Sequence, residues 1–137
     1  MRKIHREVKY APGSTTNRTS IVEVLEKRRG VCQDFAHLMI GCLRSSGLAA
    51  RYVSGYLYTG DANDAASHAW VDVWLGPEIG WQSMDVTHKR TAVRNYCRLA
   101  VGRDYLDAAP VRGVRHGGGG EKMEANVLVA ESALQQQ

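Results

Sequence analysis

The side chains best suited to nucleophilic chemistry in this 137-residue chain are a cysteine, a histidine and an aspartate that are well separated in the sequence. Cys32 follows a glycine and a valine and precedes a stretch with the pattern of an amphipathic helix. A thiol at the start of a helix lies at the positive end of the helix dipole, which favours the thiolate. His68 in "SHAW" and Asp85 in "MDVT" supply an imidazole and a carboxylate. Together the three could form a triad in which the thiolate attacks a carbonyl, the imidazole transfers protons and the carboxylate orients the imidazole.

The segments that must position these residues are predicted to be helices followed by strands. Apolar residues recur at helical spacing from about Cys32 to Ser46, and Gly47 is expected to end that helix. A shorter helix is predicted for "IVEVLEKRR", with Ser20 as its N-cap and Gly30 at its end. The order of elements favours an α+β fold, with N-terminal helices packed on an antiparallel sheet.

Three strands are predicted from alternating patterns in "ARYVSGYLYTG", "HAWVDVWL" and "GWQSMDVT". The last two are expected to form a hairpin across "GPEIG". This pairing brings His68 near Asp85, because directly opposite or diagonal cross-strand neighbours lie within reach of each other. We expect the carboxylate to contact Nδ1 of the imidazole, so that the other ring nitrogen faces Cys32. The backbone N–H of Cys32 could then donate to a developing oxyanion.

Composition excludes several other classes of protein. The formal net charge is +4, but the 18 Lys and Arg residues form no basic stripe, so we do not expect nucleic-acid binding. No apolar run is long enough to span a membrane, and the charged N-terminus does not resemble a signal peptide, so a cytoplasmic location is expected. The three cysteines lack the spacing of a disulfide framework or a structural zinc site. We expect no cofactor and no metal.

The remaining candidates have structural interpretations beside functional ones. Asp34 is interpreted as structural, Cys42 and Cys97 as core residues, and His5, His88 and His116 as solvated. Asp85 could instead cap the turn that leads to Thr87, and a zinc site formed by Cys32, His37 and His68 is a weaker alternative. Trp70 shares a strand face with His68, so it could form a wall of the site or simply pack in the core.

The stretch "RRGVCQDFAHLMIGCLRSSGLAARYVSGYL", followed by "SHAWVDVWL" and "GWQSMDVT", resembles the transglutaminase-like superfamily, in particular its bacterial members. The resemblance extends over roughly residues 5–120, including "LAVGRDYLDAAPVRGV". It implies the core fold of papain-like cysteine proteinases, with Cys32, His68 and Asp85 as the catalytic residues. It also suggests that Tyr10, upstream of the nucleophile, contributes to an oxyanion hole or a substrate wall. Many family members have an aspartate-proline-threonine-asparagine motif where this chain has "DVTH", so Val86 and His88 depart from the pattern.

The resemblance implies an enzyme that acts on amide or peptide bonds through a thioester acyl-enzyme, with hydrolysis slightly favoured over transamidation. Its substrate would be a peptide or protein with an amide or glutamine group. A catalytically silent peptide-binding module of the same fold is the main alternative, and acyl transfer from a thioester donor to an arylamine is a weaker one. Residues 1–137 are expected to form a single domain, with a Gly-rich hinge at 115–122 followed by a strand and a frayed tail. Bacterial relatives usually carry a β-rich N-terminal domain, so a missing wall or self-association is also expected.

Overall fold

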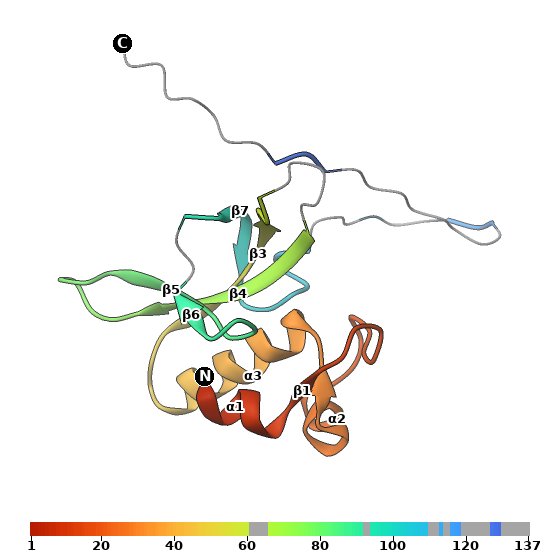
Figure 1. The fold of residues 1–137 in the computed structure, drawn as a ribbon, viewed down its shortest axis with the longest axis horizontal. Coiled ribbons are helices and arrows are strands. Elements are labelled where there is room, and N and C mark those ends of the chain that lie inside the picture. Colours follow the sequence, from red (N-terminus) through yellow and green to blue (C-terminus); the bar gives the residue numbers. More distant parts are fainter. Residues whose placement is uncertain (61–65, 92–93, 110–112, 114–115, 119–126, 130–137) are drawn as a thin grey trace, which may run out of the picture.

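The computed structural model of the protein describes residues 1–60, 66–91, 94–109, 113, 116–118 and 127–129 (Figure 1). Its helices are α1 (Arg2–Glu7), α2 (Ile21–Lys27) and α3 (Cys32–Ser45). Its strands are β1 (Lys9–Tyr10), β2 (Arg29–Gly30), β3 (Ala50–Leu57), β4 (Ala66–Trp74), β5 (Trp81–Asp85), β6 (Arg90–Thr91) and β7 (Tyr96–Gly102). The expected hinge and C-terminal strand fall largely outside the described residues. Within the described residues, no helix is both long and apolar enough to cross a membrane.

The larger sheet is antiparallel and has the strand order β6-β5-β4-β3-β7. The three helices lie together on one side of it, and α3 packs against β3 and β4 (Figure 1). The short strands β1 and β2 form a separate parallel pair beside the helices. This arrangement confirms the expected α+β fold, in which the long helix supports the hairpin from one face.

The core lies between α3 and the sheet. Phe35 and Leu38 of α3 are buried, and they belong to one cluster with Tyr52, Ala69 and Val71 of the sheet. Complete burial of a side chain such as Phe35 contributes about 1.5–3 kcal/mol to stability. The cluster therefore sets the position of α3, and with it the position of the cysteine at its first turn.

The ends of the helices show why the local sequence forms them. Ser20 caps α2 as expected, because its hydroxyl accepts a hydrogen bond from the backbone N–H of Glu23. Helix α2 ends at Arg28, which has a left-handed conformation with φ 50°, and not at Gly30 as expected. Gly47 ends α3 as expected, since its φ of 78° allows the chain to turn back under the last carbonyl groups.

Gly30 is required for packing and not for a helix end. An added Cβ at Gly30 would lie 2.8 Å from both Cβ and Oδ2 of Asp34. The carboxylate of Asp34 cannot move away freely, because it accepts hydrogen bonds from the backbone N–H of Val31 at 2.7 Å and from the hydroxyl of Thr15 at 2.6 Å. Asp34 is buried, and these bonds hold the first turn of α3 in place. Its structural interpretation is therefore confirmed.

Replacing Gly30 by alanine is expected to lower the free energy of unfolding by about 1–3 kcal/mol, because the new methyl group overpacks the contact with Asp34. Urea denaturation would measure the change. Gly41→Ala is the matched control, since nothing lies within 4 Å of its added Cβ and alanine favours a helix by up to about 1 kcal/mol. Equal destabilisation by the two substitutions would contradict the packing argument.

Two of the cysteines differ from expectation. Cys42 and Cys97 are exposed, so neither is a core residue. Cys42 lines an apolar hollow of about 470 Å³ between the helices, together with Ile4, Leu25 and Met39. The helical spacing placed Cys42 correctly on the apolar side of α3, but the described residues do not cover that part of the helix.

Candidate active site

Cys32 and His68 line one cavity of about 280 Å³ between the start of α3 and the sheet. Cys32 begins α3, and His68 is the third residue of β4, where it pairs with Gly55 of β3. Cys32 is also among the groups that raise the pKa of His68. The structure thus brings together two residues that are 36 positions apart in the sequence.

His68 contacts Asp85 through Nε2, at 2.8 Å from Oδ2. The sequence prediction of an Nδ1 contact is therefore wrong, and Nδ1 is the nitrogen left for Cys32. The β4–β5 pairing reaches the pair Val71–Met84, which makes Asp85 a diagonal neighbour of His68 and not a direct one. Both side chains are buried, with exposed fractions of 6% for His68 and 0% for Asp85.

Asp85 accepts hydrogen bonds from three side chains on a single oxygen. In addition to His68, the side chains of His88 and Tyr96 bond to Oδ2 of Asp85. Nδ1 of His88 lies 2.6 Å from this oxygen, and the hydroxyl of Tyr96 lies 2.5 Å from it. The backbone N–H of His88 also donates to Oδ1 at 3.1 Å, so Asp85 caps the turn after β5 in addition to binding His68. The expectation that His88 is simply solvated is wrong, although its side chain is 44% exposed. His88 thus supplies a donor to Asp85 at the position where the family pattern has asparagine.

These contacts raise the pKa values of His68 and Tyr96 and lower the pKa of Asp85. Burial lowers the pKa of His68, but hydrogen bonds and charges from Asp85 and Cys32 outweigh it and raise the pKa to about 9. Burial alone would raise the pKa of Asp85, yet the donors around it hold that pKa well below its usual range. Burial and the bond to Asp85 raise the pKa of Tyr96 to about 12. At neutral pH the site therefore holds an imidazolium beside a carboxylate.

Trp70 lies against His68 and outside the cavity. Its ring stacks on the imidazole with centroids 6.3 Å apart, and it meets Tyr96 edge-on at 5.2 Å. Trp70 is only 1% exposed and is not among the residues that line the cavity with Cys32, so in this structure it packs against the imidazole. Its indole N–H is buried and has no hydrogen-bond partner among the described residues.

Tyr10 lies near the start of α3 but also outside the cavity lining. It is 45% exposed, and its ring meets Phe35 edge-on at 6.2 Å. Burial and, after it, the charge of Cys32 raise the pKa of Tyr10, which places its hydroxyl within electrostatic range of the sulfur.

Sequence reasoning missed most of the cavity wall. Beside Val31, Cys32, His68 and Ala69, the wall is formed by Gln33, Tyr52, Ser54, Gly55, Ser67 and Tyr105. Alternation along β3 places Tyr52 and Ser54 on one face of the strand, which is the signal that could have found them. Tyr105 carries no such signal, because it follows β7 in a loop.

The residues that could hold a metal differ from the zinc alternative considered above. His37 is engaged elsewhere, since its Nε2 accepts a hydrogen bond from the backbone N–H of Tyr105 at 3.1 Å. In the part of the chain that the structure describes, the donors that do cluster are those of His68, Asp85 and His88, within 4.8 Å of one another. Because both imidazoles bond to the carboxylate, the cluster has the arrangement of a proton network.

Comparisons with known proteins identify relatives of this chain. Residues 1–86 match the family model of the transglutaminase-like superfamily core. The chain is 40% identical over 130 residues to an uncharacterized protein of Mycobacterium leprae, an alignment that covers 90% of this chain and 46% of that protein. It is 34% identical over 108 residues to a protein-glutamine gamma-glutamyltransferase of Pseudomonas aeruginosa, with 69% of this chain and 16% of the relative covered.

A crystal structure of a candidate cysteine protease from Cytophaga hutchinsonii superimposes with a TM-score of 0.67 at 36% identity. The superposition covers 78% of this chain and 35% of that one. The chain thus spans less than half the length of the Mycobacterium leprae relative and of the Cytophaga protein.

Proposed function

The chain belongs to the transglutaminase-like superfamily, and from that premise we propose that it is a cysteine-nucleophile enzyme acting on amide bonds through a thioester. The observation that carries this proposal is the arrangement of one cavity. Cys32 and His68 line it together, and His68 is bound at 2.8 Å to the buried carboxylate of Asp85. Nucleophilic thiol catalysis needs this order of nucleophile, base and orienting group.

In the first half of the reaction, the Cys32 thiolate attacks the carbonyl carbon of the amide and forms a C–S bond. The negative charge that develops on the carbonyl oxygen is stabilised by the backbone N–H of Cys32 at the helix start. The C–N bond then breaks, and the proton on His68 passes to the departing nitrogen, which leaves as ammonia or an amine. The thioester remains on Cys32.

In the second half, water attacks the thioester carbon while the now neutral His68 takes its proton. Collapse of the intermediate releases a carboxylic acid and restores the thiolate and imidazolium pair. An amine in place of water would give a new amide, so hydrolysis and transamidation differ only in the acceptor. We favour hydrolysis slightly, because the attacking residue, Cys32, is partly exposed to solvent. Asp85 remains ionised throughout, keeping the imidazole oriented and its positive charge stabilised.

The preferred substrate is a peptide or protein that carries a carboxamide. Support comes from the Pseudomonas relative, whose name specifies a glutamine side chain as acyl donor. Support also comes from the cavity wall, which offers tyrosine, serine and glutamine side chains to an uncharged group. No cofactor takes part in the proposed reaction.

Incubation with a blocked glutamine dipeptide is expected to release ammonia and to add the acyl mass to the peptide that contains Cys32. Coupled ammonia detection and intact-mass spectrometry would measure the two products. Hydroxylamine as a competing acceptor would show how the thioester divides between water and amine. Cys32→Ala is the control and should show neither product. If neither this dipeptide nor a mixed peptide library forms an adduct or releases an amine, the proposal fails in favour of a silent peptide-binding module.

A further inference from the structure

The segment "GRDYLD" at residues 102–107 forms a compact loop after β7 that the proposed triad leaves unexplained. Gly102 allows the loop to approach β7 closely, since an added Cβ there would clash with Cβ of Asp107. The backbone N–H and Nε of Arg103 donate to Oδ2 of Asp107 at 3.1 and 2.8 Å. Oδ1 of Asp104 accepts from the backbone N–H groups of Leu106 and Asp107 at 2.9 and 3.3 Å. The loop therefore holds its own shape through side chain-to-backbone bonds.

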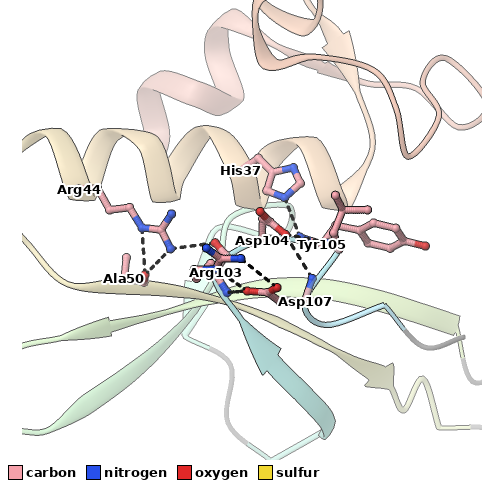
Figure 2. A network of polar contacts seen from close by, with 8 residues as sticks. His37, Arg44, Ala50, Arg103, Asp104, Tyr105 and Asp107 are labelled. Atoms are coloured by element: carbon pink, nitrogen blue, oxygen red, sulfur yellow. Dashed lines mark hydrogen bonds and ion pairs between the residues drawn. The ribbon is translucent and has the colours of Figure 1, made fainter. Parts of the chain in front are cut away.

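Two side chains of α3 hold this loop against the helix (Figure 2). Nη2 of Arg44 donates to the backbone oxygen of Arg103 at 2.8 Å and to that of Ala50 at 2.9 Å. Two turns earlier in the helix, Nε2 of His37 accepts the backbone N–H of Tyr105 at 3.1 Å. The position of the Tyr105 backbone is thus set directly by α3, which also carries Cys32.

The loop is also attached to the sheet beside the cavity. The hydroxyl of Ser54 donates to the backbone oxygen of Ala108 at 2.6 Å, and both residues are buried. Between these anchors the ring of Tyr105 meets Tyr52 edge-on, with centroids 6.3 Å apart. Tyr105 consequently forms part of the wall around Cys32.

On the basis of the proposed function, we infer that Tyr105 determines which acyl groups reach Cys32 and that His37 is the positioning residue that holds it. At about 280 Å³, the cavity is slightly smaller than small-molecule sites, which span about 300–1,000 Å³. Among the described residues, His68 is the one titratable nitrogen or carboxyl group in its lining. The cavity therefore suits small uncharged acyl groups, and the Tyr105 ring limits their size.

The role assigned to His37 requires a neutral ring. Nε2 can accept the N–H of Tyr105 only when it carries no proton, so the proton of the neutral ring is on Nδ1. The groups around this ring are Asp34 and Arg44 on its own helix, Asp104 in the loop, and the ring of Tyr52 at 5.0 Å. Burial lowers the pKa of His37 and outweighs the opposing effect of the two carboxylates, which keeps the accepting form populated at neutral pH.

Alkylation of Cys32 in the full chain by iodoacetamide and by its N-benzyl derivative would test the inference without requiring turnover. For Tyr105→Ala we expect the ratio of the two rate constants, bulky over small, to rise about tenfold. His37→Ala should raise the ratio about threefold, whereas His37→Gln, whose amide oxygen can accept a hydrogen bond, should stay closer to the original ratio.

Tyr58→Ala is the matched control, because this tyrosine bonds to the backbone oxygen of Gly60 and does not line the cavity. Tyr105→Leu provides a second variant that retains apolar packing if the alanine variant does not fold. An unchanged ratio in a folded Tyr105 variant would overturn the inference, even if both rate constants changed by the same factor. The two proposals can fail separately. If the alkylation ratio changes as expected but the glutamine dipeptide gives neither ammonia nor an adduct, the result counts against the proposed acyl-transfer chemistry and not against the role of Tyr105.

Discussion

Replacing His68 by alanine is expected to slow the alkylation of Cys32 by iodoacetamide at pH 6 by about ten- to a hundredfold. An unassisted cysteine titrates near pH 8.5, so about 0.3% of it is thiolate at pH 6. We expect the imidazolium of His68, which lines the same cavity as Cys32, to assist the reaction of the thiol. Peptide mass spectrometry after timed labelling would give the rate for each cysteine separately.

The effect of His68→Ala should depend on pH in a defined direction. The pKa of His68 is raised to about 9, so its positive charge is present through neutral pH and is lost as the pH rises through 9. The difference between the variant and the original protein should therefore be largest below about pH 8 and should shrink above 9. Cys42 and Cys97 are exposed and serve as internal controls. If Cys32 labels no faster than these two at pH 6, the nucleophile assignment is wrong.

Replacing Asp85 by alanine is expected to lower the free energy of unfolding by about 3 kcal/mol. The fully buried carboxylate accepts hydrogen bonds from the buried imidazole of His68 and from the partly exposed His88 and Tyr96, so its removal leaves three donors without this acceptor. Urea denaturation at pH 7 would measure the loss. Because the pKa of Asp85 lies well below its usual range, its stabilising effect is present above about pH 4 and disappears as the pH falls further, so the penalty should shrink in acid.

Two further substitutions serve as comparisons for Asp85→Ala: one separates the charge of Asp85 from its shape, and the other is a control at the surface. Asp85→Asn preserves the volume and one accepting oxygen, so we expect a smaller loss of stability with slowed alkylation of Cys32 at pH 6. Lys27→Ala removes an exposed helical ion pair with Glu23 and should cost no more than about 0.5 kcal/mol. A cost for Asp85→Ala as small as that of Lys27→Ala would show that the hydrogen bonds around the carboxylate contribute little to stability.

The sequence by itself determined the main helices, the hairpin and the pair of residues that the hairpin brings together. The bounds of α3, the Ser20 cap, the turn at Gly47 and the hairpin of β4 and β5 all follow from patterns within a few residues. Hydrophobic periodicity and turn chemistry are local, so they can be read without knowing the fold. Pairing of the hairpin then placed His68 near Asp85, a neighbour 17 residues away.

Only the tertiary structure decided how the side chains of the site meet. The choice of Nε2 over Nδ1 depends on how α3 lies across the sheet, which no spacing in the sequence specifies. The contacts of His88 and Tyr96 with Asp85 arise where a turn and a distant strand converge on one carboxylate. Tyr105 reaches the cavity because its backbone bonds to His37, 68 residues earlier. Local patterns select helices and strands, whereas side-chain orientation is set by contacts between segments that come together only when the chain packs.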